Sequence, residues 1–108
     1  MPRRERLSAE RRFERWRALQ AQRLTRHALG LATIAGTLVD RHGGCVEGEG
    51  LVIQRMPAPA GLFVWDAAYG RELLHVDTGG CALFYQRGAW EQRLLALVAQ
   101  DLPRRHEE

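Results

Sequence analysis

The chain of 108 residues contains no lysine, so all sixteen of its basic side chains are arginine. Cysteine is also scarce, and two cysteines do not make a disulfide framework, which excludes the disulfide-dense class of small secreted proteins. No apolar run approaches the roughly 18 residues that a membrane-spanning helix needs. The arginine-rich start lacks the apolar segment of a secretory signal peptide. We therefore expect a cytoplasmic protein with reduced cysteines and no membrane partner.

The overall composition is ordinary for a globular protein, with 45% hydrophobic and 27% charged residues. A chain of this length buries roughly 65% of its unfolded surface on folding, which is enough for a hydrophobic core without stabilising disulfide bonds. We expect a single domain over residues 1–108 and exclude a disordered or collagen-like chain.

A helical pattern dominates the first part of the chain. Ser8 is a typical N-cap residue, and no proline occurs between residues 3 and 56. Apolar residues recur at the helical spacing of about three or four. The pattern predicts a flexible basic start over 1–8 and a long helix over 9–39, with a basic first half and a buried second half. The apolar residues that carry it include Phe13, Trp16, Leu24, Ala28, Leu31, Ala35 and Leu38.

The middle of the chain is typical of an antiparallel sheet. Short apolar segments joined by glycine- and proline-rich turns predict a meander of three to four strands within residues 45–86. The segment 45–49 is a further candidate edge strand, although its neighbouring glycines count against it. The apolar spacing after Trp90 predicts a C-terminal helix over 89–101, and a frayed tail over 103–108 follows. The expected fold class is α+β, with a long N-terminal helix, an antiparallel sheet and a short C-terminal helix.

Charge is distributed unevenly along the chain. Residues 1–27 hold nine arginines and three glutamates, a net charge of +6, and residues 28–108 hold seven arginines and ten acids, a net charge of −3. Such an asymmetry favours an anionic partner for the basic part. The alternative is that the arginines pair with nearby glutamates, or that the helix docks on the acidic part of its own chain.

The basic helix is the strongest functional feature. Guanidinium groups bind phosphate and carboxylate oxygens in a bidentate manner, and apolar side chains beside them can anchor a protein contact. The candidate anionic-partner residues are Arg11, Arg12, Arg15, Arg17, Arg23 and Arg26, and the candidate anchors are Phe13, Trp16, Trp65 and Tyr69.

This pattern predicts a non-enzymatic regulatory protein, without a cofactor, that docks on a larger protein or nucleoprotein complex. Small proteins of this size and charge are often inhibitors or accessory factors, including those carried by phages and mobile elements. The alternative is direct binding of nucleic acid through its phosphate backbone, by the same helix.

The segment 62–65 is apolar on both faces of its predicted strand, because Leu62 and Val64 alternate with Phe63 and Trp65. An antiparallel sheet covered on one face does not need this pattern. We therefore expect a homodimer, formed through the sheet or through the long helix.

A second class of function depends on histidine and cysteine. His42 and Cys45, together with His75 and Cys81, include the nitrogen and sulfur ligands that zinc prefers, and Asp77 lies beside them in sequence. The same residues offer a cysteine–histidine nucleophile pair, but no oxyanion hole accompanies it. These residues can also be purely structural, with a buried thiol at each cysteine, one histidine at a helix end and one on a sheet face. A small zinc-binding or cysteine/histidine-dependent protein is therefore an alternative.

The sequence Asp77-Thr78-Gly79 resembles the motif of retroviral-type aspartic proteases, which share a proton between two such aspartates. That resemblance implies a dimeric protease, but it covers only three residues. Too few residues follow the motif for the strands those enzymes need, and their fold has no long N-terminal helix. A hairpin turn accounts for the same residues, and we predict a turn here.

Overall fold

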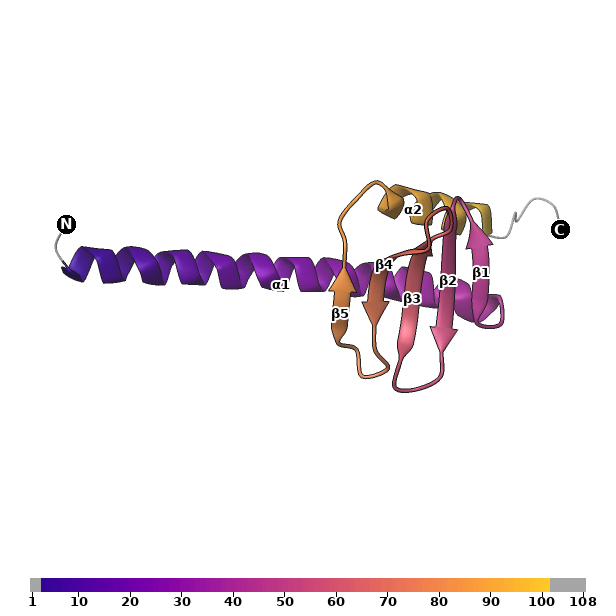
Figure 1. Cartoon of the computed structure of the whole chain (residues 1–108), viewed down its shortest axis with the longest axis horizontal. Coiled ribbons are helices and arrows are strands. Elements are labelled where there is room, and N and C mark those ends of the chain that lie inside the picture. The colour runs from indigo at the N-terminus through magenta and orange to yellow at the C-terminus, as the bar shows by residue number, and fades with distance from the viewer. Residues whose placement is uncertain (1–2, 102–108) are drawn as a thin grey trace.

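The computed structural model describes the backbone of residues 3–101 and the side chains of residues 9–101. The fold is α+β, as predicted, with two helices and a sheet of five strands rather than three to four. The elements are α1 (Arg3–Arg41), β1 (Cys45–Gly48), β2 (Leu51–Met56), β3 (Gly61–Asp66), β4 (Arg71–Val76), β5 (Ala82–Tyr85) and α2 (Trp90–Asp101) (Figure 1). The predicted tail over 103–108 lies outside the described residues.

The sheet is an antiparallel meander in which each strand pairs with the next, in the order β1-β2-β3-β4-β5. The additional strand is β1, whose Val46 lies opposite Ile53 of β2. Glu49 and Gly50 join these two strands with positive φ values of 51° and 72°. Such a two-residue turn matches the twist of the strands, which is why the glycine-rich segment pairs rather than forming a loop.

Helix α1 begins at Arg3, earlier than the predicted residue 9, so residues 3–8 are helical rather than flexible. Ser8 lies inside the helix and does not cap it. Arginine, glutamate and leucine before Ser8 all favour a helix, which explains the longer element. The helix ends at Arg41, two residues beyond the predicted residue 39, and Gly44, at a φ of 103°, donates a backbone hydrogen bond of 2.9 Å to the carbonyl oxygen of Val39.

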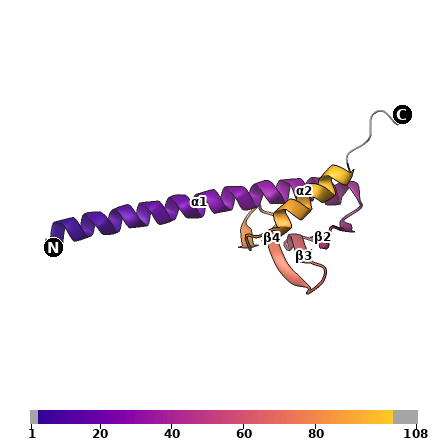
Figure 2. The ribbon, with the colours of Figure 1, turned by 90° about the horizontal axis from the view of Figure 1, so that it is seen from above.

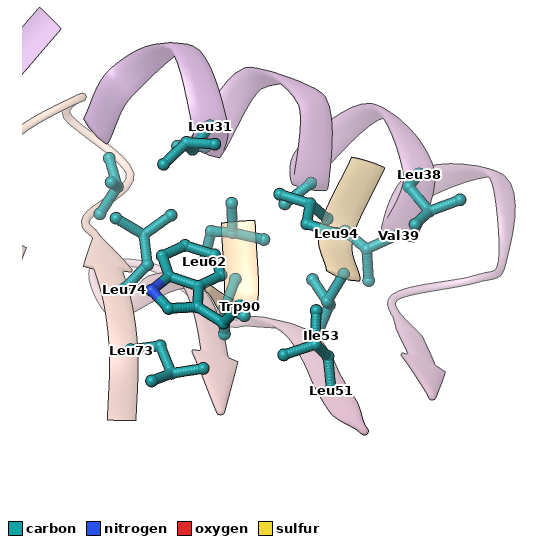
Figure 3. Packing of buried hydrophobic residues seen from close by; sticks show 14 of the residues in the cluster. Leu31, Leu38, Val39, Leu51, Ile53, Leu62, Leu73, Leu74, Trp90 and Leu94 are labelled. Carbon is teal, nitrogen blue, oxygen red and sulfur yellow. The ribbon is translucent and has the colours of Figure 1, made fainter. Parts of the chain in front are cut away.

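Both helices cover the same face of the sheet (Figure 2). The core lies between the helices and that face (Figure 3). Its first buried residue on α1 is Ala28. Burial of these apolar side chains is the main source of folding free energy. The largest fully buried side chains are Leu51, Ile53, Leu74, Leu94, Val39 and Val64.

The other face of the sheet carries an aromatic row. The Phe63 ring stacks on Trp65 with 5.0 Å between ring centroids, and on His75 with 3.9 Å. All three side chains are half-buried. Leu62 and Val64 point the other way, into the core. The rings therefore bury part of one another's surface. This contact explains some of the apolar character of the segment 62–65, from which the sequence analysis expects a second subunit over this face.

The N-terminal half of α1 extends well beyond the sheet (Figures 1 and 2). The molecule is 70 Å long and 33 Å by 26 Å across as a result. We refer to residues 9–26 of α1 as the overhang. Every side chain of the overhang is exposed except that of Gln20, which is half-buried. The buried second half of the helix agrees with the sequence prediction.

Candidate interaction surface

All six candidate arginines lie on the overhang and are exposed. Among the described side chains, none of the six forms an ion pair. The glutamates of the overhang, Glu10 and Glu14, do not neutralise them. The structure therefore favours arginines that are available to a partner over arginines that pair within their own helix.

Three aspartates in the acidic part of the chain are paired with basic groups of the same part. Asp40 accepts hydrogen bonds of 2.6 and 3.1 Å from Arg55. Asp66 lies 3.6 Å from the guanidinium of Arg93. Asp101 is engaged similarly at the end of α2, by Arg41 and His42. These carboxylates stabilise the body of the protein and are not a docking site for its own overhang.

The arginines are concentrated on one side of the overhang. Arg11 and Arg15 are one turn apart, and Arg26 follows Arg15 by eleven residues, close to three turns. Arg12 and Arg23 are also eleven residues apart and lie beside this row. We refer to these five arginines as the basic face.

The four large apolar side chains of the overhang are divided between two sides of the helix: Phe13 and Leu24 lie opposite the basic face, whereas Trp16 borders it and Leu19 lies within it. Two residues along a helix correspond to a rotation of about 200°. Phe13 is two residues from Arg11 and Arg15, and Leu24 is two residues from Arg26. Phe13 and Leu24 therefore lie on the side of α1 that faces the sheet further along the helix, where Leu31 is buried.

Two further side chains of the overhang lie close to Phe13. The Trp16 ring stacks on Phe13 with 6.1 Å between ring centroids. The Arg17 guanidinium lies 5.8 Å from the Phe13 centroid, so this arginine accompanies the apolar side rather than the basic face. Phe13 and Trp16 nevertheless remain 56% and 57% exposed.

The predicted anchors do not form one surface. Phe13 and Trp16 lie together on the overhang, whereas Trp65 lies on the open face of the sheet. Tyr69 lies in the turn between β3 and β4 and is 82% exposed. Only the first two are in a position to act with the arginines.

A hollow of about 280 Å³ lies where the overhang meets the sheet. Small side chains of α1, Ala21, Thr25 and Ala28, line one wall with Leu24. The edge strand β5 supplies the other wall, and its Leu83 and Phe84 are 59% and 42% exposed. The sequence analysis did not single out Leu83 or Phe84, because nothing in the sequence places β5 beside α1.

A hydrogen-bonded cluster fixes the root of the overhang to the body. His27 of α1 bonds to Glu91 of α2. The other carboxylate oxygen of Glu91 accepts a hydrogen bond of 2.9 Å from the Tyr85 hydroxyl and one of 3.1 Å from the Gly88 amide. The cluster therefore joins α1, β5 and the start of α2. Sequence analysis missed it, since 64 residues separate His27 from Glu91.

The cluster shifts the ionisation of both of its acidic groups. Burial acts to raise the pKa of Glu91, but hydrogen bonds from His27, Gly88 and Tyr85 outweigh it, and the pKa falls below its ordinary value of 4.5. Burial raises the pKa of Tyr85 to about 12, and the hydrogen bond to Glu91 adds to the effect. Glu91 is thus held as a carboxylate, and Tyr85 as a neutral donor.

The candidate zinc ligands are not brought together. His42 bonds to Asp101 at 2.6 Å, and His75 bonds to the Ala60 carbonyl oxygen at 2.6 Å. Cys45 and Cys81 are free and exposed, contrary to the expected buried thiols. Over the part of the chain that the structure describes, no three histidine, cysteine or acidic side chains converge as a metal site would require.

Asp77 has a structural role in the turn between β4 and β5. Its Oδ1 accepts hydrogen bonds from the backbone amides of Gly79, at 3.0 Å, and Cys81, at 2.8 Å. This agrees with the predicted turn and not with a catalytic aspartate, since the oxygen is used in closing the loop.

In the described residues, no helix is both long and apolar enough to cross a membrane. A scan against protein-family models and searches of curated proteins and of solved structures gave no match. The function of this chain is therefore inferred from the surface just described.

Proposed function

We propose that this chain is a non-enzymatic binding protein of the cytoplasm, which docks its overhang on the anionic surface of a larger protein or nucleoprotein complex. In this proposal the basic face of α1 makes the contact, and the sheet with α2 serves as the rigid base. The proposal includes an inhibitor or accessory factor of such a complex, of the kind carried by phages and mobile elements.

One observation carries the proposal: the overhang presents exposed arginines that have no counter-ion among the described side chains, whereas Asp40, Asp66 and Asp101 of the body are paired with basic groups. Unpaired charges of one sign on a projecting rod create a field that accelerates encounter with an opposite charge. After the encounter, each guanidinium can donate two parallel hydrogen bonds to a phosphate or a carboxylate.

The spacing of the basic face also suits a polyanion. From Arg11 to Arg26 the helix rises about 22 Å, at roughly 1.5 Å per residue. Phosphates along a duplex or carboxylates on an acidic protein surface are repeated over such a length. This supports direct contact with nucleic acid as the second candidate, in which the same arginines bind the phosphate backbone.

The test is a binding titration monitored by fluorescence anisotropy, at several salt concentrations. The probes are a short random DNA duplex, a short single strand and a poly-glutamate peptide. We expect binding that weakens as salt rises, and its loss in the triple variant Arg11→Gln, Arg12→Gln and Arg15→Gln. Each lost phosphate contact should lower the slope of log K against log salt by roughly 0.9 for a duplex.

The matched control is Arg71→Gln, which removes an exposed arginine from the start of β4. It should leave the titration unchanged. Binding to nucleic acid alone would favour the second candidate, and binding to poly-glutamate as well would favour a general anionic surface. Absence of binding to every probe at low salt would refute a role for the basic face.

A further inference from the structure

We propose that a phosphate monoester binds in a hollow at the root of the overhang, where its oxygen atoms accept hydrogen bonds from Arg23 of α1 and from Arg87 of the segment between β5 and α2. The phosphate belongs to a free small molecule or to the end of a nucleic-acid strand, and the experiment separates these two sources. The proposal rests on the proposed function in one respect, because Arg23 is also part of the basic face.

The hollow has a volume of about 240 Å³ and lies between two parts of the chain that are distant in sequence. Helix α1 supplies one wall through residues at helical spacing, and the segment after β5 supplies the other through Arg87. We refer to it as the root hollow. Among the described residues that line it, none is acidic. The lining residues are Gln20, Arg23, Leu24, His27 and Arg87.

The two arginines of the root hollow are available to a ligand. Both are exposed, and within residues 9–101 neither forms an ion pair with a carboxylate. The pKa of Tyr85 is raised mainly by its burial and by Glu91, and the charge of Arg87 acts against that rise, which places this guanidinium near the Tyr85 hydroxyl. Arg23 and Arg87 therefore line the same hollow from different elements, each with a charge that no described acid neutralises.

The hydrogen-bonded cluster at the root of the overhang fixes the two walls of the root hollow relative to each other. His27 lines the hollow and bonds to Glu91 of α2, which also bonds to Tyr85 of β5. These contacts hold α1 against the two elements between which Arg87 lies. A site whose walls are already held in place loses less conformational entropy when a ligand binds.

The carboxylate of Glu91 lines an adjoining hollow rather than the root hollow. The adjoining hollow shares His27 and Arg87 with the root hollow but is lined by Glu91 as well. Both oxygens of this carboxylate are already bonded within the cluster. Its negative charge repels an anion from the adjoining hollow, so the root hollow, which Arg23 lines, is the favourable place for one.

The donors of the root hollow favour a phosphate monoester over a carboxylate or a phosphodiester. Each guanidinium presents two parallel N–H groups to a pair of oxygens, so two guanidiniums require three or more acceptor oxygens. A phosphate monoester has three unesterified oxygens and a charge of about −1.5 to −2 at neutral pH, which matches two arginines. A carboxylate and a phosphodiester each offer only two such oxygens and a single negative charge. Gln20 adds an amide donor on the α1 wall.

The test is isothermal titration calorimetry of the full chain with inorganic phosphate, at constant ionic strength. We expect saturable binding, and acetate should bind at least about tenfold more weakly. Arg23→Gln and Arg87→Gln should each weaken phosphate binding by about 10- to 100-fold, because each removes hydrogen bonds to a charged group. Arg71→Gln is the matched control, since Arg71 is an exposed arginine that does not line the hollow. All three substituted side chains are exposed, so thermal unfolding should show that the variants remain folded.

A second titration separates the two sources of the phosphate. If the end of a nucleic-acid strand is the ligand, a short single strand with a 5′-phosphate should bind more tightly than the same strand with a 5′-hydroxyl. Arg87→Gln should then remove the difference. Equal affinity of the two strands, together with binding of inorganic phosphate, would assign the root hollow to a free small phosphate.

The variants also distinguish a failure of this proposal from a failure of the proposed function. The triple glutamine variant of the basic face should lose duplex binding and keep its affinity for inorganic phosphate. Its nearest substituted residue, Arg15, lies about 12 Å along the helix from Arg23, beyond the roughly 8 Å screening length at 0.15 M salt. Arg87→Gln should have the reverse effect. Absence of saturable phosphate binding by the wild type, or equal losses in Arg71→Gln and Arg87→Gln, would overturn the phosphate site and leave the basic face untouched.

Discussion

His27 and Glu91 hold α1 and α2 together at the root of the overhang, and Glu91 also bonds to Tyr85 and to the backbone of Gly88. The Glu91 side chain is only 15% exposed and that of His27 is 52% exposed. The pair thus consists of a shielded carboxylate and an accessible imidazole. It joins the two helices at the point where α1 leaves the body of the protein.

Replacement of Glu91 by glutamine should destabilise the fold by about 1–3 kcal/mol, because a shielded carboxylate that accepts several hydrogen bonds is lost. Urea unfolding is the measurement. Glu47→Gln is the control, since Glu47 lies exposed on β1 and should change the free energy of unfolding by less than about 0.5 kcal/mol. Equal effects of the two variants would show that the cluster has no special role.

The stability of the protein should fall in acid, partly through Glu91. Its pKa is lower in the folded state than the ordinary value of 4.5, so its contribution to stability is fully present above that value. The contribution is lost as the pH falls through the lower, folded-state pKa. In Glu91→Gln the loss of stability below pH 4.5 should be shallower, which thermal unfolding across the acid range would reveal.

Leu74→Ala should cost about 2–5 kcal/mol, because the side chain is fully buried between the sheet and the helices and its removal leaves a cavity. Leu95→Ala removes an equal number of atoms from an exposed position and should cost less than about 0.5 kcal/mol. The two free energies of unfolding compare directly. Similar values would contradict the arrangement of the core.

Gly61→Ala should destabilise the fold, since this glycine has a φ of 88° at the start of β3. A Cβ atom there would lie 2.3 Å from the backbone oxygen of Val76, which cannot move without disturbing β4. Gly70→Ala is the comparison: its φ is 62°, but a Cβ atom would meet no neighbour within 4 Å. The midpoint of thermal unfolding should fall much further for Gly61→Ala than for Gly70→Ala.

Removal of metal should leave the protein folded. A chelator should not shift the thermal unfolding curve, because His42, His75 and the two cysteines each have separate surroundings. Metal analysis of the purified protein is the companion measurement. One zinc ion per chain, with unfolding on chelation, would revive the zinc-binding alternative.

Much of the fold follows from local patterns. The spacing of Leu31, Ala35 and Leu38 predicts the buried side of α1, and the turn chemistry around Asp77 predicts the hairpin that its carboxylate closes. The start of α1 and the presence of a fifth strand were harder to predict from the sequence. Ser8 has the chemistry of a cap but lies within strong helix formers, and the Glu49-Gly50 turn lacks the usual asparagine or aspartate.

The sequence by itself determined the fold class, the concentration of arginine at the N-terminus and the helical register of those arginines, because composition and periodicity are local properties. Only the tertiary structure decided that the overhang projects free of the body, that Asp40, Asp66 and Asp101 are paired with basic groups of the body, and that β5 lies beside Leu24. These facts depend on where distant segments meet. The spacing of residues along a helix shows which side chains share a face, but only packing shows which face is left uncovered.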